Sequence, residues 1–517
     1  MAIRLQDKSD KSFQVATVKC MVKMARSLAI ASLLLLVVIS AEALAQQDSG
    51  NLTKGNAAPQ KTIEASEIIS KINSDQPVSY DNIVLLGYLD LSNLDGPISQ
   101  PFKITNSTIV QPANFEEVIF LDLLDLRGTT FKNQTNFART VFQGDTAFGG
   151  TTFSGDTDFR FAQFSRSVLF SKARFEGLVS FSNAQFDGNA NFEGSDFEDD
   201  AKFDLVRFSR PVTFMGATFS KDLSFTNSLL TSTSVFMNAN FKDNASFAGT
   251  RFASDVIFRS SRFSKNSIFG LTTFGGFSDF ANVDFQEDAF FAVAKFLDLA
   301  HFLNVKFNKD LILENARIYS MELDDVSFSK DSKVNLNEAD FTRLVVPWSV
   351  IKDRLVFNGT AYLGLVKNYK NLEWYDDADD SYYQYRQISQ ANEPWGWSKI
   401  IDIISWLSAG YGVRVSYTIF WCFFTILFFG LIFWAGNGMR RFEFVGVEVP
   451  SNLKNIQGQR VSLVDALYFS VAMFTTSQSP VNNYPVGVYR HLAMIEGILG
   501  WFFLGLFVVV LSGLLIR

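Results

Sequence analysis

Residues 131–153 read FKNQTNFARTVFQGDTAFGGTTF and contain the pattern that organises the chain. Phenylalanines recur at steps that alternate between six and five residues, beginning with Phe131 and Phe137. The pattern continues to Phe307, with Leu230 in place of one phenylalanine. Because the alternation returns to the same phase every eleven residues, it indicates an internal repeat.

The residue two positions before each phenylalanine is small or β-branched in most repeats. Examples are Thr129, Thr135, Thr140, Thr146 and Thr151. A narrow coil with a square cross-section needs one large and one small inward side chain on each side to fill its interior at native density. The intervening Asn, Asp, Gly and Ser are poor helix formers and favour turns. The pattern therefore predicts short strands joined by corners.

This pattern resembles the pentapeptide-repeat family, whose units have a central Leu or Phe and a small residue two positions before it. The resemblance covers about residues 98–328. It implies a right-handed quadrilateral β-helix with four units per coil, which we assign to residues 83–346 with a cap over 83–94. A period of twenty-two residues over 98–318 predicts about ten coils. The extra residue in every second step is expected to bulge alternate corners.

Composition excludes several classes of protein. The 517 residues include 46 Lys and Arg against 53 Asp and Glu, a net charge of −7, with the signs mixed along the repeats. This balance gives little support to a nucleic-acid partner or a DNA mimic. Two cysteines and two histidines are too few for a disulfide framework or a histidine-rich metal centre. No catalytic constellation can be assigned, so we expect no enzyme, no cofactor and no metal.

The N-terminal residues 1–45 have the features of a secretory signal peptide. Basic residues, a short apolar run and an Ala-Leu-Ala site precede Gln46. A start at Met21 or Met24 would supply the same signal, and an uncleaved anchor helix is the alternative. The polar residues 46–82 predict a flexible linker.

Helical periodicity over residues 347–412 predicts a small helical linker after the repeats. Its helices are expected at Trp348–Phe357, Tyr362–Leu372 and Asp377–Ala391. Trp395 and Trp406 then flank an isoleucine-rich stretch, which predicts an amphipathic helix at a lipid interface.

Four aspartates lie at the start of the last linker helix: Asp376, Asp377, Asp379 and Asp380. They are compatible with a calcium site, but they lack the glycine and the distal Glu of an EF-hand loop. We favour an acidic first helical turn stabilised by the helix dipole.

Residues 413–517 form the last predicted domain. The stretches 413–435 and 486–516 are each long and apolar enough to span a bilayer. Between them, residues 462–476 read SLVDALYFSVAMFTT, and Tyr484-Pro485 follows. This segment resembles the pore module of two-helix potassium channels.

The resemblance to this pore module implies a re-entrant pore helix over residues 462–476 and a homotetramer in the lipid bilayer. Asp465 lies in the opening of the pore helix. Glu496 and Gly500 occupy the positions of a buried glutamate behind the pore helix and of a glycine hinge. We expect the partner of Glu496 to come from the region of Tyr468 or Thr476.

The expected filter departs from the potassium-channel pattern. Its residues are Thr475, Thr476, Ser477, Gln478, Ser479 and Pro480. Potassium channels read Thr-Val-Gly-Tyr-Gly-Asp here, and the glycines let successive carbonyls face the axis. Since both glycines are missing, we expect a pore for monovalent cations that is not potassium-selective. The alternative is a non-conducting, membrane-anchored scaffold that binds protein partners through its repeats.

The distribution of basic residues predicts the topology. An exported repeat domain places the segment between the two spans in the cytoplasm, and that segment contains Arg440, Arg441, Lys454 and Arg460, against Arg517 alone after the second span. The sequence therefore predicts a multi-pass protein of the cell membrane, with the repeat domain extracytoplasmic and the pore loop entering from the cytoplasm.

Overall fold

The computed structural model describes residues 60–441, 461–480 and 483–515. The chain forms two compact units, residues 1–265 and 266–517. The predicted signal peptide lies outside the described residues.

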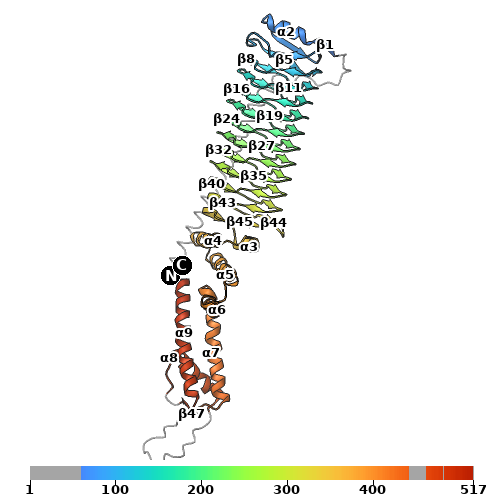
Figure 1. The fold of residues 1–517 in the computed structure, drawn as a ribbon. Coiled ribbons are helices and arrows are strands. Elements are labelled where there is room, and N and C mark those ends of the chain that lie inside the picture. Colours follow the sequence, from blue (N-terminus) through green and yellow to red (C-terminus); the bar gives the residue numbers. More distant parts are fainter. Residues whose placement is uncertain (1–59, 442–460, 481–482, 516–517) are drawn as a thin grey trace, which may run out of the picture. The chain divides into compact units, whose positions relative to one another are not determined.

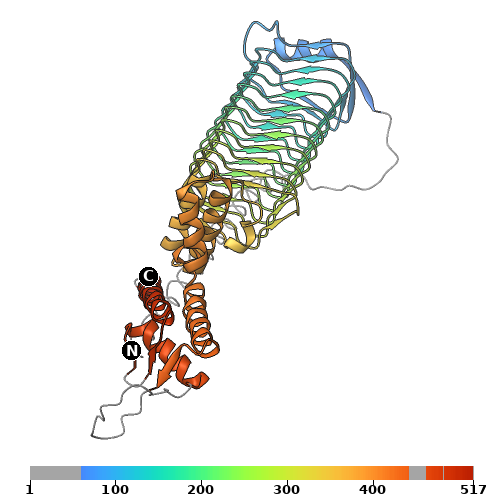
Figure 2. The same cartoon turned by 60° about the horizontal axis from the view of Figure 1, so that its bottom comes forward.

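In the first unit, four short strands make each turn of a β-solenoid. One turn contains β10 (Thr130–Phe131), β11 (Thr135–Asn136), β12 (Val141–Phe142) and β13 (Thr146–Ala147). Each strand pairs in parallel with the strand 22 residues later, as β10 does with β14 (Thr152–Phe153). The turns stack in register along each face (Figures 1 and 2).

One face supplies ten strands in the first unit, from β1 (Lys61–Glu64) to β34 (Arg262–Phe263). The same face supplies three in the second unit, from β38 (Asp284–Phe285) to β44 (Ser327–Phe328). The solenoid thus has about 13 turns, more than the ten predicted, because it begins before residue 98 and continues beyond residue 318. Its four-strand turns confirm the β-solenoid, and its handedness stays a prediction.

The repeated phenylalanines fill the interior of the solenoid. Rings one turn apart stack face to face, as Phe159 and Phe181 do with centroids 4.7 Å apart and planes 3° apart. Rings of opposite faces, half a turn apart, meet edge to face, as Phe170 and Phe181 do at 5.5 Å and 82°. Each geometry suits the quadrupole of the ring, so the period of the sequence becomes a column of aromatic contacts.

The small residues two positions before the phenylalanines also point inward. Thr140 and Thr151 are fully buried, and their hydroxyls donate to the carbonyl oxygens of Phe115 at 2.7 Å and Leu126 at 2.8 Å. Threonine therefore fills the small inward position and also satisfies its own polar group.

The two kinds of corner differ in backbone conformation. Residues with positive φ fall in the five-residue steps, for example Arg139 (56°) and Asn183 (62°). The six-residue steps, such as the one that contains Gly144, turn without such a residue. The extra residue was expected to bulge its corner. The six-residue corner turns with ordinary φ values, the five-residue corner contains a left-handed residue, and the bulge stays a prediction.

The linker predicted over residues 46–82 is wrong for its described part. Residues 61–81 form β1, α2 (Ala65–Asn73) and β2 (Val78–Asp81). Helix α2 packs against the first strands with Ile68 fully buried, so it closes the solenoid end. The segment expected to be the cap contains β3 (Ile83–Leu86) and β4 (Leu89–Asp90), which are strands of the solenoid.

In the second unit, the last turns of the solenoid have longer strands on one face: β40 (Lys295–His301), β43 (Arg317–Glu322) and β46 (Asp340–Val345). Helices α3 (Trp348–Ile351), α4 (Gly359–Asn371) and α5 (Tyr375–Asn392) follow, close to the predicted positions. The Asn368 side chain of α4 bonds both backbone groups of Leu344, at 3.0 and 2.7 Å, and so fixes α4 to β46.

The remaining elements of the second unit are mostly apolar helices. They are α6 (Trp397–Ala409), the 3-10 helix η2 (Gly410–Gly412), α7 (Val415–Ala435), β47 (Met439–Arg441), α8 (Leu463–Thr476), β48 (Asn483–Pro485) and α9 (Tyr489–Leu515). Helices α7 and α9 are long and apolar enough to cross a membrane, by length and composition. Helix α8 packs against both of them (Figure 1).

Candidate functional site

The start of α8 is capped by its own side chains. Ser462 accepts a hydrogen bond from the backbone N–H of Asp465 at 3.2 Å, and its hydroxyl donates to the Asp465 carboxylate at 2.8 Å. Residues that satisfy free N–H groups at this position fix where a helix begins. Ser462, held by Asp465, therefore caps the start of α8.

Helix α8 is held between α7 and α9 by a buried apolar cluster. Phe433 of α7 and Phe469 of α8 meet edge to face at 5.2 Å, and Ala466 and Ala493 are buried beside them. The two helices approach so closely that a Cβ on Gly430 would lie 2.6 Å from Leu467 Cδ2. The position of α8 is thus set by side-chain packing along its length.

Glu496 is fully buried where α8 crosses α9, and Ser470 donates a hydrogen bond to its Oε1. The partner comes from the predicted region, since Ser470 lies two residues after Tyr468, but it is neither Tyr468 nor Thr476 itself. Tyr468 is 62% exposed, and Thr476 donates to the carbonyl of Ala472 at 2.7 Å. Ser470 lies on the helix face that packs against α9, which determines the partner.

Gly500 provides the close contact between α8 and α9. A Cβ at this position would lie 2.0 Å from the carbonyl oxygen of Phe474. Glycine is therefore required for packing there, whereas the hinge role expected from the resemblance stays a prediction.

The expected filter residues follow the end of α8. Thr475 and Thr476 donate to carbonyl groups one turn back, each at 2.7 Å. Ser477 ends the helix in the left-handed conformation (φ 56°), and Trp501 Nε1 donates to its Oγ at 3.0 Å. Gln478 and Ser479 are exposed in the single chain, as are the two threonines.

Ser477 and Ser479 line an open groove of about 550 Å³. Its other walls are Pro485, Arg490 and the α9 residues Ala493, Met494, Gly497, Ile498 and Trp501, together with Met473 of α8. Pro480 lies at the edge of the described residues and is not among the lining residues. The structure thus brings Ser477 and Ser479 together beside the apolar face of α9.

The end of α7 and the start of α9 are joined. Strands β47 and β48 pair antiparallel, with Arg440 opposite Tyr484. The Tyr489 hydroxyl donates to the carbonyl of Gly436 at 3.0 Å, and its ring occupies the space that a Cβ on Gly438 would need. These contacts hold the C-terminal end of α7 beside the N-terminal end of α9. We call this contact region the fixed edge.

A polar network connects α5 to the start of α7. Arg414 pairs with Asp380 at 2.5 Å and lies over the ring of Tyr383, which hydrogen-bonds Trp406 and Tyr417. Burial, with a smaller contribution from the Asp402 charge, raises the pKa of Tyr411 to about 12. Its neutral hydroxyl donates to Gln390 of α5 at 2.9 Å.

The aspartate cluster has structural contacts in α5. Asp376 and Asp377 lie in its first turn, as expected, and Asp377 also accepts the backbone N–H of Trp348 at 3.2 Å. Asp380 lies beyond the first turn and pairs with Arg414. In α6, Trp397 is 82% and Ile401 63% exposed. This exposed apolar face fits the expected interfacial helix.

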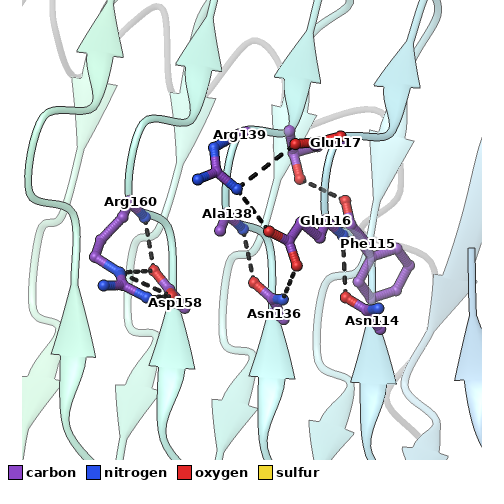
Figure 3. Close-up of polar contacts among 10 residues, drawn as sticks. Asn114, Phe115, Glu116, Glu117, Asn136, Ala138, Arg139, Asp158 and Arg160 are labelled. Carbon is purple, nitrogen blue, oxygen red and sulfur yellow. Dashed lines mark hydrogen bonds and ion pairs between the residues drawn. The ribbon is translucent and has the colours of Figure 1, made fainter. Parts of the chain in front are cut away.

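The first unit has a polar groove of about 610 Å³ on the face of β11. Side chains 22 residues apart lie in register along it, including Asn114, Asn136 and Asp158 (Figure 3). Their polar groups are paired with nearby side chains: Asp158 forms an ion pair with Arg160, and the Asn136 amide donates to Glu116 at 3.1 Å. The groove presents a stable polar surface without a catalytic constellation among its lining residues.

A family model described as Pentapeptide repeats (9 copies) matches residues 115–163, 162–207, 183–229 and 203–250. No curated protein and no solved structure matches the chain. The matched residues lie in the first unit, so the chain is similar to pentapeptide repeats over its β-solenoid.

Proposed function

We propose that the chain is the subunit of a cation pore in the cell membrane, with its β-solenoid on the extracytoplasmic side. The supporting observation is the arrangement of α8. It is a 14-residue apolar helix, about 21 Å long at the usual rise per residue, packed between two helices long enough to span. A bilayer core is about 30 Å thick, so α8 is too short to cross it.

A chain segment whose helix is too short to cross the bilayer must leave the membrane on the side from which it entered. The fixed edge formed by Gly436, Tyr484 and Tyr489 supports this topology, because α7 ends and α9 begins there. Helix α8 reaches α9 through β48 at this same edge. These contacts support a re-entrant loop built on α8 and β48.

In a homotetramer, the exposed residues after α8 would meet around the axis. Gln478 and Ser479 offer side-chain oxygens and no charge, and the left-handed backbone at Ser477 turns the chain away from α8. Side-chain oxygens coordinate partly hydrated monovalent cations without the spacing that selects potassium. The proposed pore is therefore a monovalent cation pore that is not potassium-selective.

The polar network between α5 and α7 gives the solenoid a defined connection to such a pore. Arg414, Tyr417 and Trp421 at the start of α7 join this membrane helix to the linker helices α5 and α6 through three separate contacts. A force or ligand acting on the last solenoid turns would reach α7 along this path.

The second candidate is a membrane-anchored scaffold without flux, which the polar groove on the face of β11 favours. Stoichiometry and flux distinguish the two. Protein purified in detergent should have the mass of four chains by light scattering, and in liposomes it should release trapped K⁺ and Na⁺ at similar rates. A monomer that releases neither would favour the scaffold.

A further inference from the structure

The long strands near the end of the solenoid bring an imidazole and two carboxylates together. His301 at the end of β40 is the register partner of Glu322 at the end of β43, and Asp324 follows two residues later. One ligand atom from each residue lies within 4.8 Å of the others. His301 is 8% exposed, and both carboxylate residues are partly buried.

A buried carboxylate lies close to the histidine of this cluster. Asp279 is fully buried and pairs in register with His301, whose Nδ1 lies 3.9 Å from Asp279 Oδ1. A carboxylate behind a metal-bound histidine commonly orients the ring and raises its basicity. On the opposite side, Arg343 Nη1 lies 2.8 Å from Glu322 Oε1.

We propose that His301, Glu322 and Asp324 form a site for a first-row divalent cation, with Zn²⁺ as the fitting ion. One imidazole nitrogen and two carboxylate oxygens suit zinc, whereas Ca²⁺ and Mg²⁺ take oxygen ligands almost entirely. Three protein ligands leave a fourth tetrahedral position for water. The site is independent of the proposed pore.

Zinc binding at this site would compete with an existing ion pair. Ligand atoms around tetrahedral zinc lie about 3.4 Å apart, given bond lengths of about 2.1 Å, so the three side chains must converge further. Glu322 then shifts its negative charge from Arg343 toward the metal. Arg343 lies on β46 beside Leu344, which α4 holds through Asn368. The metal would thus act on the strand that carries the linker helices.

The test is zinc binding to the full chain, purified in detergent without a histidine tag, measured by titration calorimetry. We expect one high-affinity Zn²⁺ per chain that a large excess of Ca²⁺ or Mg²⁺ does not displace. His301→Gln and Asp324→Asn should each weaken binding at least tenfold. Arg343→Gln should tighten binding severalfold, because it removes the competing cation, and a purely structural ion pair would not produce that gain.

Two matched variants separate this site from adventitious binding. His491→Gln removes the other histidine of the chain, and Asp325→Asn removes an exposed carboxylate next to Asp324 at a left-handed position that asparagine tolerates. Both should bind zinc as the parent does. Circular dichroism checks that each variant is folded. If His301→Gln misfolds, Asp324→Asn decides the test. Unchanged affinity in folded Asp324→Asn, or loss in His491→Gln, would overturn the assignment.

Discussion

The hydroxyl of Ser470 in α8 forms a hydrogen bond with Oε1 of Glu496 in α9, and the same hydroxyl oxygen lies 2.7 Å from the carbonyl oxygen of Ile426 in α7. One side chain thus links all three apolar helices. A hydroxyl has a single proton, so it cannot donate fully to both acceptors. Oε2 of Glu496 is buried without a hydrogen-bond partner among the described residues. Both observations favour a neutral carboxyl group, in which case the Ser470 hydroxyl donates to Ile426 and accepts the carboxyl proton of Glu496.

Glu496→Gln should therefore be tolerated, because the amide N–H₂ can donate to Ser470 in place of the carboxyl proton. Glu496→Ala should destabilise the membrane unit by about 2–4 kcal/mol through the cavity and the lost hydrogen bond. The measurement is the thermal unfolding midpoint of the detergent-solubilised oligomer. A glutamine variant as unstable as the alanine variant would show that a charged carboxylate is required.

The contact between Gly500 and Phe474 predicts a strong effect of one methyl group. Gly500→Ala places a Cβ 2.0 Å from a backbone oxygen and should cost about 1–3 kcal/mol, with partial loss of the oligomer on size-exclusion chromatography. Gly505→Ala is the matched control, because nothing lies within 4 Å of its Cβ. If Gly500→Ala behaves like Gly505→Ala, the α8–α9 packing described above is incorrect.

The stacked rings predict local instability in the solenoid. Phe186 stacks on Phe164 at 4.7 Å and on Phe208 at 4.5 Å, so Phe186→Ala should cost about 3–5 kcal/mol. Limited proteolysis should then cut near this turn first, because each turn contacts only its neighbours. Phe161→Ala, at a ring that is 49% exposed, should leave the protease pattern unchanged. Equal patterns in the two variants would contradict an aromatic core.

The solenoid was predictable because its core phenylalanines repeat every eleven residues in alternating steps of six and five, as the faces of a four-sided coil require. The first turn was missed because Ile63, Ile68 and Val78 are isolated among polar residues and follow no such period. Among the site residues, Asp465 lies in the first turn of α8, which Ser462 caps, and Glu496 is buried against α8; the pore roles expected for both stay predictions.

The partner of Glu496 could not be fixed from the sequence, because it depends on which face of α8 meets α9. The pair formed by His301 and Glu322, in contrast, left a signal in the sequence. The two residues are 21 positions apart, one fewer than the 22 residues of a solenoid turn. Side chains at about that spacing lie on the same face. Counting residues along the repeat is therefore enough to identify such pairs.

The predicted orientation can be tested with single cysteines. In a background with Cys20 and Cys422 replaced by serine, Lys202→Cys on the exposed side of β23 (Ala201–Lys202) should react with a membrane-impermeant maleimide on intact cells. Lys454→Cys, between the spans, should react only after lysis, because the basic segment is expected in the cytoplasm. The opposite labelling would reverse the topology and place the solenoid inside.

The most direct test of the cation pore is the current through the purified parent and its Gln478→Lys variant in planar bilayers. The parent should conduct Na⁺ and K⁺ with similar permeability. Gln478→Lys places four ammonium groups around a poorly screened axis and should abolish cation current by charge repulsion. Gln478→Glu, of nearly the same shape and opposite sign, should still conduct cations. A parent tetramer that passes no current under any voltage, tension or pH, or a Gln478→Lys variant that conducts cations as the parent does, would contradict a pore lined by Gln478.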